Sequence, residues 1–115
     1  MEHTGKNPGI VQGVVHTAAS YGDTNNKDTI FVANTSTEFH IYQANLTSEK
    51  IEFSVDGQKF HTYQPSVRTS DNWPFDRDFF IIMNIAMGGN LGGPIDPKLE
   101  KATMEVDYVR IYLNK

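Results

Sequence analysis

The stretch that decides the fold is Trp73-Pro74-Phe75-Asp76-Arg77-Asp78-Phe79-Phe80-Ile81-Ile82-Met83-Asn84-Ile85-Ala86-Met87-Gly88-Gly89-Asn90. In residues 79–87 both alternation classes are apolar apart from Asn84, a pattern typical of a strand that is covered on both faces at the centre of a sheet. The run is too short to span a membrane and ends at two glycines, which favours an interior strand. Asn84 is the polar exception, so its amide must either be hydrogen-bonded in the core or face an opening.

Two further segments give clear strand patterns. Residues 10–17 alternate, with Val11, Gly13, Val15 and Thr17 on one side of a strand and a partly polar set, Gln12, Val14 and His16, on the other. Residues 50–63 alternate into Asp56-Gly57 and out again, which predicts a β-hairpin with a primed turn.

Weaker strand patterns cover residues 29–32, 38–47 and 103–113, and a long polar segment over residues 18–28 is predicted to be a surface loop. We find no helix-period segment of useful length, no internal repeat and no linker. Six or seven strands separated by Gly, Pro, Asn and Asp turns predict an all-β, antiparallel sandwich in a single domain.

Size and composition exclude several classes of protein. The chain has 115 residues, 38% of them hydrophobic, which suffices for one small domain with its own core. The net charge is -4 and the basic residues are scattered, which argues against nucleic acid as a partner. We see neither a membrane-spanning segment nor a signal peptide. The chain has no Cys and no closely spaced His pair, which argues against disulfides and a zinc site.

Taken in order, several pieces of the chain resemble the C-terminal half of the catalytic domain of family 16 glycoside hydrolases, specifically the laminarinase-type β-1,3-glucanases. The pieces are Met1-Glu2-His3-Thr4-Gly5, Gly13-Val14-Val15-His16-Thr17, Phe39-His40-Ile41-Tyr42, Lys50-Ile51-Glu52-Phe53-Ser54-Val55-Asp56-Gly57, Trp73-Pro74-Phe75-Asp76, Met83-Asn84-Ile85-Ala86-Met87-Gly88-Gly89-Asn90 and Val106-Asp107-Tyr108-Val109-Arg110-Ile111-Tyr112. The resemblance implies a jelly-roll, concanavalin A-like sandwich that is truncated at its N-terminus, with residues 1–115 as the C-terminal half of the domain. It also implies a sugar-binding cleft on the concave face.

The family signature on one cleft strand is Glu-x-Asp-x-x-Glu, in which the first Glu is the nucleophile and the last is the acid/base. The resemblance aligns Glu2 with the acid/base, so the nucleophile and the Asp would lie upstream of Met1. Retaining glycosidases need two carboxylates roughly 5 Å apart. We therefore expect hydrolysis by this chain alone to be absent or very weak. Without the resemblance, Glu2 reads as a solvated terminal carboxylate.

Four other residues have both a functional and a structural interpretation. The resemblance suggests His16 and Asn84 as substrate-binding residues, although each could be a hydrogen-bonded structural residue. Trp73 could stack on a sugar ring, or it could anchor the core beside Pro74. Asp107 matches a position that supplies an oxygen to a structural Ca²⁺ in many relatives, and it also fits an exposed strand carboxylate.

The resemblance thus predicts a retaining, endo-acting β-glucanase whose partner is a β-glucan, with an extracellular or cell-envelope location expected of the family. An alternative from another class is a non-catalytic, lectin-like sandwich that binds glucan through the remaining half of the cleft. A third is a fragment that folds only with its missing half or self-associates, because a halved sheet exposes edges and core.

Overall fold

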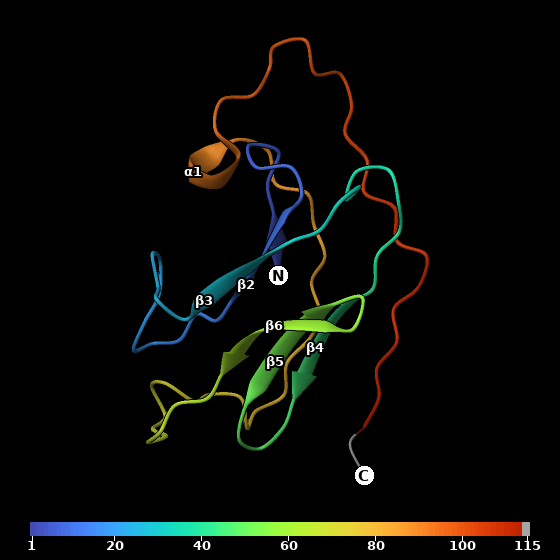
Figure 1. The fold of residues 1–115 in the computed structure, drawn as a ribbon. Helices are drawn as coiled ribbons and strands as arrows, with labels where there is room; N and C mark the ends of the chain where they lie inside the picture. Colours follow the sequence, from blue (N-terminus) through green and yellow to red (C-terminus); the bar gives the residue numbers. More distant parts are fainter. Residues whose placement is uncertain (114–115) are drawn as a thin grey trace.

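Six short strands in two antiparallel sheets make up the regular structure of the chain (Figure 1). The computed structural model describes residues 1–113. One sheet has the order β1-β2-β3 and the other β4-β5-β6. The strands are β1 (Glu2–His3), β2 (Ile10–Val14), β3 (Lys27–Phe31), β4 (Tyr42–Leu46), β5 (Ile51–Val55) and β6 (Gln58–Tyr63). The prediction of an all-β, antiparallel fold is confirmed.

Strand β2 is the centre of the first sheet because it pairs with β1 along one edge and β3 along the other, and its two faces differ in polarity. Val11 and Gly13, with Val15 and Thr17 beyond the end of the strand, are buried, whereas Gln12 is only half-buried. This is the alternation that the sequence predicts. Gly13 lies directly under the rings of the other sheet, where an added Cβ would be 3.0 Å from Phe60 Cε2. A bare backbone at this position lets the two sheets approach each other.

The hairpin of β5 and β6 follows from its turn residues. Asp56 and Gly57 both adopt positive φ, at 50° and 79°, which is the geometry of a primed two-residue turn. The side chains of Ile51, Phe53 and Val55 point into the core, as predicted. β4 pairs with the other edge of β5, with Ala44 opposite Phe53.

The core lies between the two sheets in two clusters. The first joins Val11 and Val32 to Val55, and the second joins Val15 to the buried β5 and β6 side chains and to Trp73. Trp73 is stacked on Tyr63 with ring centroids 6.0 Å apart, and the Tyr63 hydroxyl donates to the Asn72 carbonyl at 2.6 Å. These contacts fix the segment after β6 against the body of the molecule.

Two predicted strands are absent from the described residues. Residues 79–87, predicted as an interior strand, and residues 103–113, predicted as the last strand, are extended chain without strand pairing. An interior strand needs hydrogen-bonded neighbours on both edges, and no described segment lies in register beside either stretch. These two segments therefore have the apolar pattern of strands but belong to no sheet among the described residues.

A four-residue helix, α1 (Gly89–Gly92), follows the first of these segments. Gly88, Gly89 and Gly93 have φ between 70° and 74°, so glycine is needed at each of these bends. Beyond α1 the chain makes a wide excursion and returns along one side of the sheets (Figure 1). Within residues 1–113, no helix has the length and apolar character needed to span a membrane.

Candidate active site

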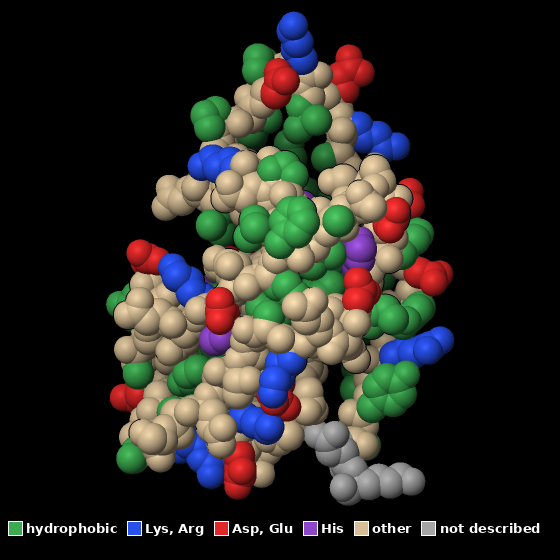
Figure 2. Space-filling view, viewed as in Figure 1, with side chains coloured by type: hydrophobic (Ala, Val, Ile, Leu, Met, Phe, Trp, Pro, Cys, Tyr) green, Lys and Arg blue, Asp and Glu red, His purple; other side chains and the backbone are tan. Residues whose placement is uncertain are grey.

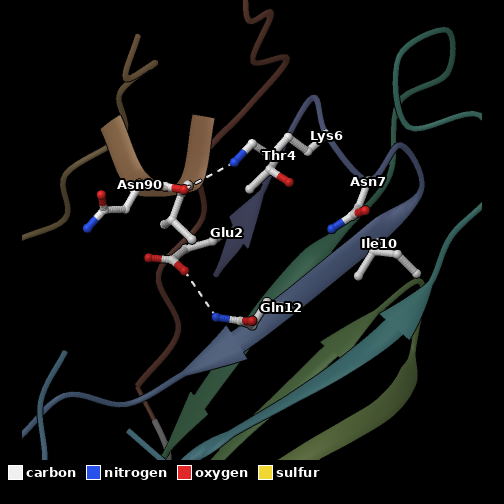
Figure 3. Close-up of a pocket in the computed structure, with 8 residues that line it drawn as sticks. Glu2, Thr4, Lys6, Asn7, Ile10, Gln12 and Asn90 are labelled. Carbon is white, nitrogen blue, oxygen red and sulfur yellow. Dashed lines mark hydrogen bonds between the residues drawn. The ribbon is translucent and has the colours of Figure 1, made fainter. Parts of the chain in front are cut away.

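Glu2 lies on β1, half-buried, with a defined partner. It faces Gln12 in the β1–β2 register, and the Gln12 amide Nε2 donates a hydrogen bond to Glu2 Oε2 at 3.2 Å (Figure 3). Both side chains lie on the polar face of β2, away from the buried Val11 and Gly13. The carboxylate of Glu2 is thus half-buried and hydrogen-bonded within a sheet, and its acid/base role stays a prediction.

A cavity of about 240 Å³ opens beside this carboxylate. Lys6 closes one side, since its Nζ donates to the Asn90 carbonyl at 3.3 Å and its stem lies against Gly93 (Figure 3). Residues 84 positions apart in the chain are thereby joined over the cavity. The lining residues are Glu2, Thr4, Lys6, Asn7, Ile10, Gln12, Asn90 and Leu91.

The residues that line the cavity provide one carboxyl group for acid–base catalysis, whereas a retaining glycosidase uses two. Glu2 carries the one carboxyl group among these residues, and the amides, the hydroxyl and the ammonium around it can hydrogen-bond to sugar hydroxyls. The site therefore offers a single acid or base with polar surroundings.

His3, which the sequence analysis does not single out, holds the turn next to Glu2. The Gly9 backbone N–H donates to His3 Nε2 at 3.3 Å, and the Thr35 hydroxyl lies 3.1 Å from the same nitrogen. The ring thus ties β1 both to the β1–β2 turn and to the segment after β3. Strand alternation was the available signal, since it places His3 on the opposite face from Glu2.

The predicted substrate-binding residues do not line the Glu2 cavity. His16 is exposed two residues beyond β2, on the same alternation class as Gln12, and Asn84 is exposed in the unpaired segment. Trp73 is 8% exposed in the core and packs edge-on against Phe75 with centroids 5.3 Å apart. Trp73 also borders a second open cavity of about 510 Å³, where Arg68 lies over its ring at 5.7 Å. The described residues thus bring Glu2 together with Gln12 and Lys6 instead, and substrate binding by His16, Asn84 and Trp73 stays a prediction.

A match to a known protein family identifies the family of this chain. The model of glycosyl hydrolases family 16 matches residues 1–110. The chain belongs to glycosyl hydrolase family 16. The resemblance seen in the sequence is confirmed.

Two similar proteins carry glucanase names and are longer than this chain. Beta-glucanase from Rhodothermus marinus is 42% identical over 97% of this chain, which spans 42% of that protein. Glucan endo-1,3-beta-glucosidase from Cryptopygus antarcticus is 32% identical over 95% of this chain and 46% of its own length. The chain therefore spans less than half the length of these family 16 relatives.

The solved structure of laminarinase from Flavobacterium sp. UMI-01 shares the fold. It superposes with a TM-score of 0.78 at 37% identity and covers 82% of this chain but 41% of the laminarinase chain. The jelly-roll assignment of family 16 thus holds for the two sheets seen here. More than half of the laminarinase chain has no counterpart in them.

Asp107 does not form a calcium site with other described residues. Its carboxylate is exposed in the unpaired C-terminal segment, and residues 1–113 contain no group of three or more acidic, His or Cys side chains able to hold a metal. Ca²⁺ takes roughly six to eight oxygen ligands. The acidic, His and Cys side chains of the described residues therefore do not supply the ligands of this ion on their own.

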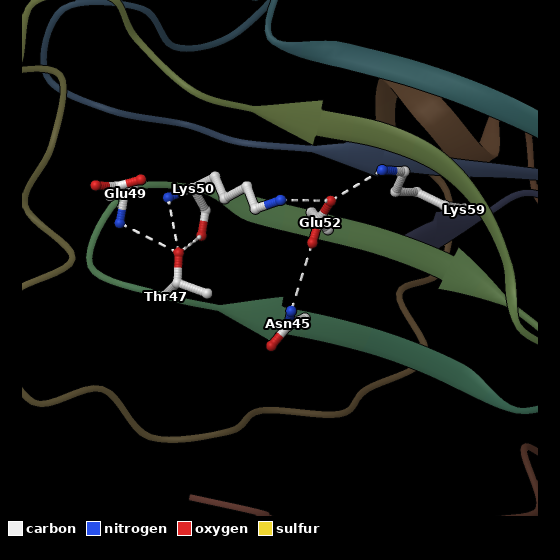
Figure 4. A network of polar contacts seen from close by, with 6 residues as sticks. All are labelled: Asn45, Thr47, Glu49, Lys50, Glu52 and Lys59. Atoms are coloured by element: carbon white, nitrogen blue, oxygen red, sulfur yellow. Dashed lines mark hydrogen bonds and ion pairs between the residues drawn. The ribbon is translucent and has the colours of Figure 1, made fainter. Parts of the chain in front are cut away.

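The strongest electrostatic effects lie in the second sheet, away from Glu2. Glu52 on β5 accepts hydrogen bonds from Lys59 Nζ and Lys50 Nζ, each at 3.0 Å, and from Asn45 at 3.4 Å (Figure 4). The bonds from Lys59 and then Lys50 lower the pKa of Glu52 to about 2. Since these groups form an exposed network between neighbouring strands, we interpret them as structural.

Proposed function

We propose that this chain is the part of a retaining, endo-acting β-1,3-glucanase domain that carries the acid/base carboxylate. The observation that supports it is Glu2 paired with Gln12 beside an open polar cavity in a family 16 chain. The names of two relatives, beta-glucanase and glucan endo-1,3-beta-glucosidase, support β-glucan as the substrate class.

In this proposal Glu2 protonates the leaving glycosidic oxygen and then removes a proton from the water that releases the sugar. Gln12 donates to Oε2, and Oε1 accepts no hydrogen bond within the described residues, so it is the oxygen that can carry the transferred proton. The two oxygens of one carboxylate thus have separate tasks, orientation and proton transfer.

A retaining mechanism also needs a nucleophile roughly 5 Å from the acid/base. Glu2 is the one carboxylate that lines the cavity among the residues the structure describes. We therefore expect that this chain by itself binds glucan at most and does not turn it over.

The test is hydrolysis of soluble laminarin, measured by release of reducing ends. It compares this chain with a version extended upstream by the N-terminal half of the domain that the resemblance implies, including the whole Glu-x-Asp-x-x-Glu segment. Turnover is expected only in the extended protein and not in this chain. Glu2→Gln in the extended protein should lower kcat by about 100-fold or more. The matched control is Glu49→Gln, which changes an exposed carboxylate in the turn between β4 and β5 and should leave kcat unchanged.

Two outcomes would argue against the proposal. Turnover by the short chain would mean that another carboxylate acts as nucleophile. Saturable oligosaccharide binding with no turnover in the extended protein would favour the lectin-like alternative, which needs a cleft but no second carboxylate.

We also propose that a structural Ca²⁺, which has no catalytic role here, takes Asp107 as one ligand and its other oxygens from outside the described residues. Calorimetric titration should then show no Ca²⁺ binding to this chain and binding to the extended protein, with loss of that binding on Asp107→Asn.

Since secretion is the rule in the family, we propose that the protein lies outside the cell or in the cell envelope.

A further inference from the structure

The second cavity, of about 510 Å³, lies beside Trp73 and shares no lining residue with the cavity beside Glu2. Its volume falls within the roughly 300–1,000 Å³ that is typical of small-molecule pockets. The residues that line it are Ser48, Arg68, Thr69, Ser70, Trp73, Pro74, Phe75, Asp76 and Arg77. Two of the three arginines in the sequence are thus gathered at one cavity.

The loop that carries Arg68 is held in shape by its own hydrogen bonds. Asn72 Oδ1 accepts from the Thr69 backbone N–H at 2.8 Å, and Asn72 Nδ2 donates to the Val67 carbonyl at 2.9 Å. The Trp73 backbone N–H donates to the Thr69 carbonyl at 2.8 Å. These bonds all lie within residues 67–73, so this wall of the cavity does not depend on the unpaired segments that follow it.

Neither arginine at this cavity has a carboxylate partner within the described residues. The Arg68 guanidinium lies over the Trp73 ring at 5.7 Å, and its Nη1 donates to the Ser48 carbonyl. Arg77 is exposed and forms no hydrogen bond in the described part of the chain. A guanidinium has five N–H donors in a planar fork that matches an oxyanion. Most donors of these two side chains therefore have no acceptor among the described residues.

The charge of the lining favours an anion with a single negative charge. Arg68 and Arg77 contribute two positive charges and Asp76 one negative charge, which leaves a net charge of +1. A sulfate ester or a carboxylate carries one negative charge, whereas a phosphate ester carries roughly -1.5 to -2 at pH 7. Figure 2 shows basic and acidic side chains interspersed over one face of the molecule, without a broad basic area. A small acidic ligand therefore suits this chain better than a long polyanion.

The rest of the lining suits a sugar ring. The hydroxyls of Ser48 and Ser70 can form hydrogen bonds with sugar hydroxyls. Pro74 and Phe75 are half-buried and offer apolar surface to the C–H face of a pyranose. The cavity thus combines oxyanion donors with polar and apolar surface for the ring that carries the oxyanion.

We propose that this cavity is a second saccharide site, which binds a small sugar carrying a sulfate or carboxylate group. The guanidinium groups of Arg68 and Arg77 hold the oxyanion, and the hydroxyls and the apolar surface hold the ring. The site is separate from the Glu2 cavity, so the proposal does not depend on hydrolysis of glucan.

NMR titration of this full chain tests the proposal, because Trp73 is the one tryptophan in the sequence and gives a single indole N–H signal. Glucose 6-sulfate and glucuronate should each shift this signal saturably. Glucose should bind about tenfold more weakly or less, because it lacks the charge-assisted hydrogen bonds. Inorganic sulfate should be weaker by a similar factor, because it lacks the ring. Glucose 6-phosphate should bind no more tightly than glucose 6-sulfate.

Matched variants separate the cavity from the overall charge of the chain. Arg77→Gln should weaken binding of glucose 6-sulfate by about tenfold or more. Arg110→Gln removes the same charge from the exposed C-terminal segment and should leave binding unchanged. Asp76→Asn should tighten binding by about two- to fivefold, because a like charge leaves the cavity. Asp78→Asn, at an exposed residue outside the lining, should have no effect.

The proposal is wrong if no probe shifts the indole signal, if glucose binds as tightly as glucose 6-sulfate, or if Arg110→Gln weakens binding as much as Arg77→Gln. Equal affinity for inorganic sulfate would overturn the saccharide and leave a bare oxyanion site. Glu2→Gln should leave the titration unchanged. Failure of laminarin hydrolysis with intact binding at this cavity would remove the proposed function and not this site.

Discussion

At the scale of single residues, the pair of His40 and Asp56 links the segment before β4 to the turn between β5 and β6. His40 Nδ1 lies 2.8 Å from Asp56 Oδ2, and the Ile41 backbone N–H donates to Asp56 Oδ1 at 2.8 Å. The hydrogen bond to Asp56 raises the pKa of His40 above 6.5. The Ile41 N–H, and next His40, lower the pKa of Asp56 below 3.8. This pair is therefore most stabilising at mildly acidic pH.

The resulting pH dependence can be tested through Asp56→Asn. The contribution of His40 to the free energy of unfolding is complete below pH 6.5 and is lost as pH rises through the raised pKa of the folded chain. That of Asp56 is present above pH 3.8 and is lost as pH falls through its lowered pKa. Asn tolerates the positive φ of 50° at this turn, removes the charge and replaces one acceptor oxygen by an NH2 donor.

We expect Asp56→Asn to lower the midpoint of the His40 ring titration, measured by NMR. It should also reduce the loss of stability with rising pH above 6.5. Asp78→Asn, in an exposed loop, is the control and should leave the midpoint where it was. An unchanged midpoint in Asp56→Asn would show that another group raises the pKa of His40.

At the scale of elements, the packing of β2 against the hairpin depends on Gly13. An added Cβ would lie 3.0 Å from Phe60 Cε2 and 3.1 Å from Phe53 Cγ, both on the opposite sheet. Gly13→Ala should therefore lower the free energy of unfolding by about 1–3 kcal/mol relative to Gly5→Ala. At Gly5 an added Cβ meets no atom within 4 Å. Both variants have the same effect of alanine on the unfolded chain, so the difference between them reports the packing cost at Gly13. Urea unfolding followed by Trp73 fluorescence measures the difference, and equal midpoints would contradict the packing argument.

The same elements show where sequence patterns suffice and where they fail. The faces of β2 and the Asp56-Gly57 turn could be predicted because local alternation and turn chemistry determine them. Residues 79–87 and 103–113 have an equally strong pattern, but a strand exists only with neighbours, which the pattern cannot supply. At the candidate site, the family motif predicts Glu2, whose acid/base role stays a prediction. The contact of Lys6 with Asn90 could not be predicted, because it depends on how a distant glycine-rich loop folds back.

At the scale of the whole molecule, the chain is more expanded than its length requires. Its radius of gyration is 15.5 Å, against roughly 13 Å for a compact domain of this size. The core is small and lies between the two sheets, and most of the large apolar side chains after residue 78 are exposed. Stability in the chain alone should therefore reside in residues 9–75.

A pair of truncations tests this division. Val11 is 1% exposed between the sheets, so Val11→Ala should cost about 1.5–3 kcal/mol of unfolding free energy. Ile82 is the larger side chain but is 71% exposed, so Ile82→Ala should change that free energy by less than about 0.5 kcal/mol. Urea unfolding of the chain alone gives both values. A cost at Ile82 equal to that at Val11 would mean that residues 79–87 already pack in solution, either on the sheets or on a second copy of the chain. A rise of the urea midpoint with protein concentration would identify the second copy.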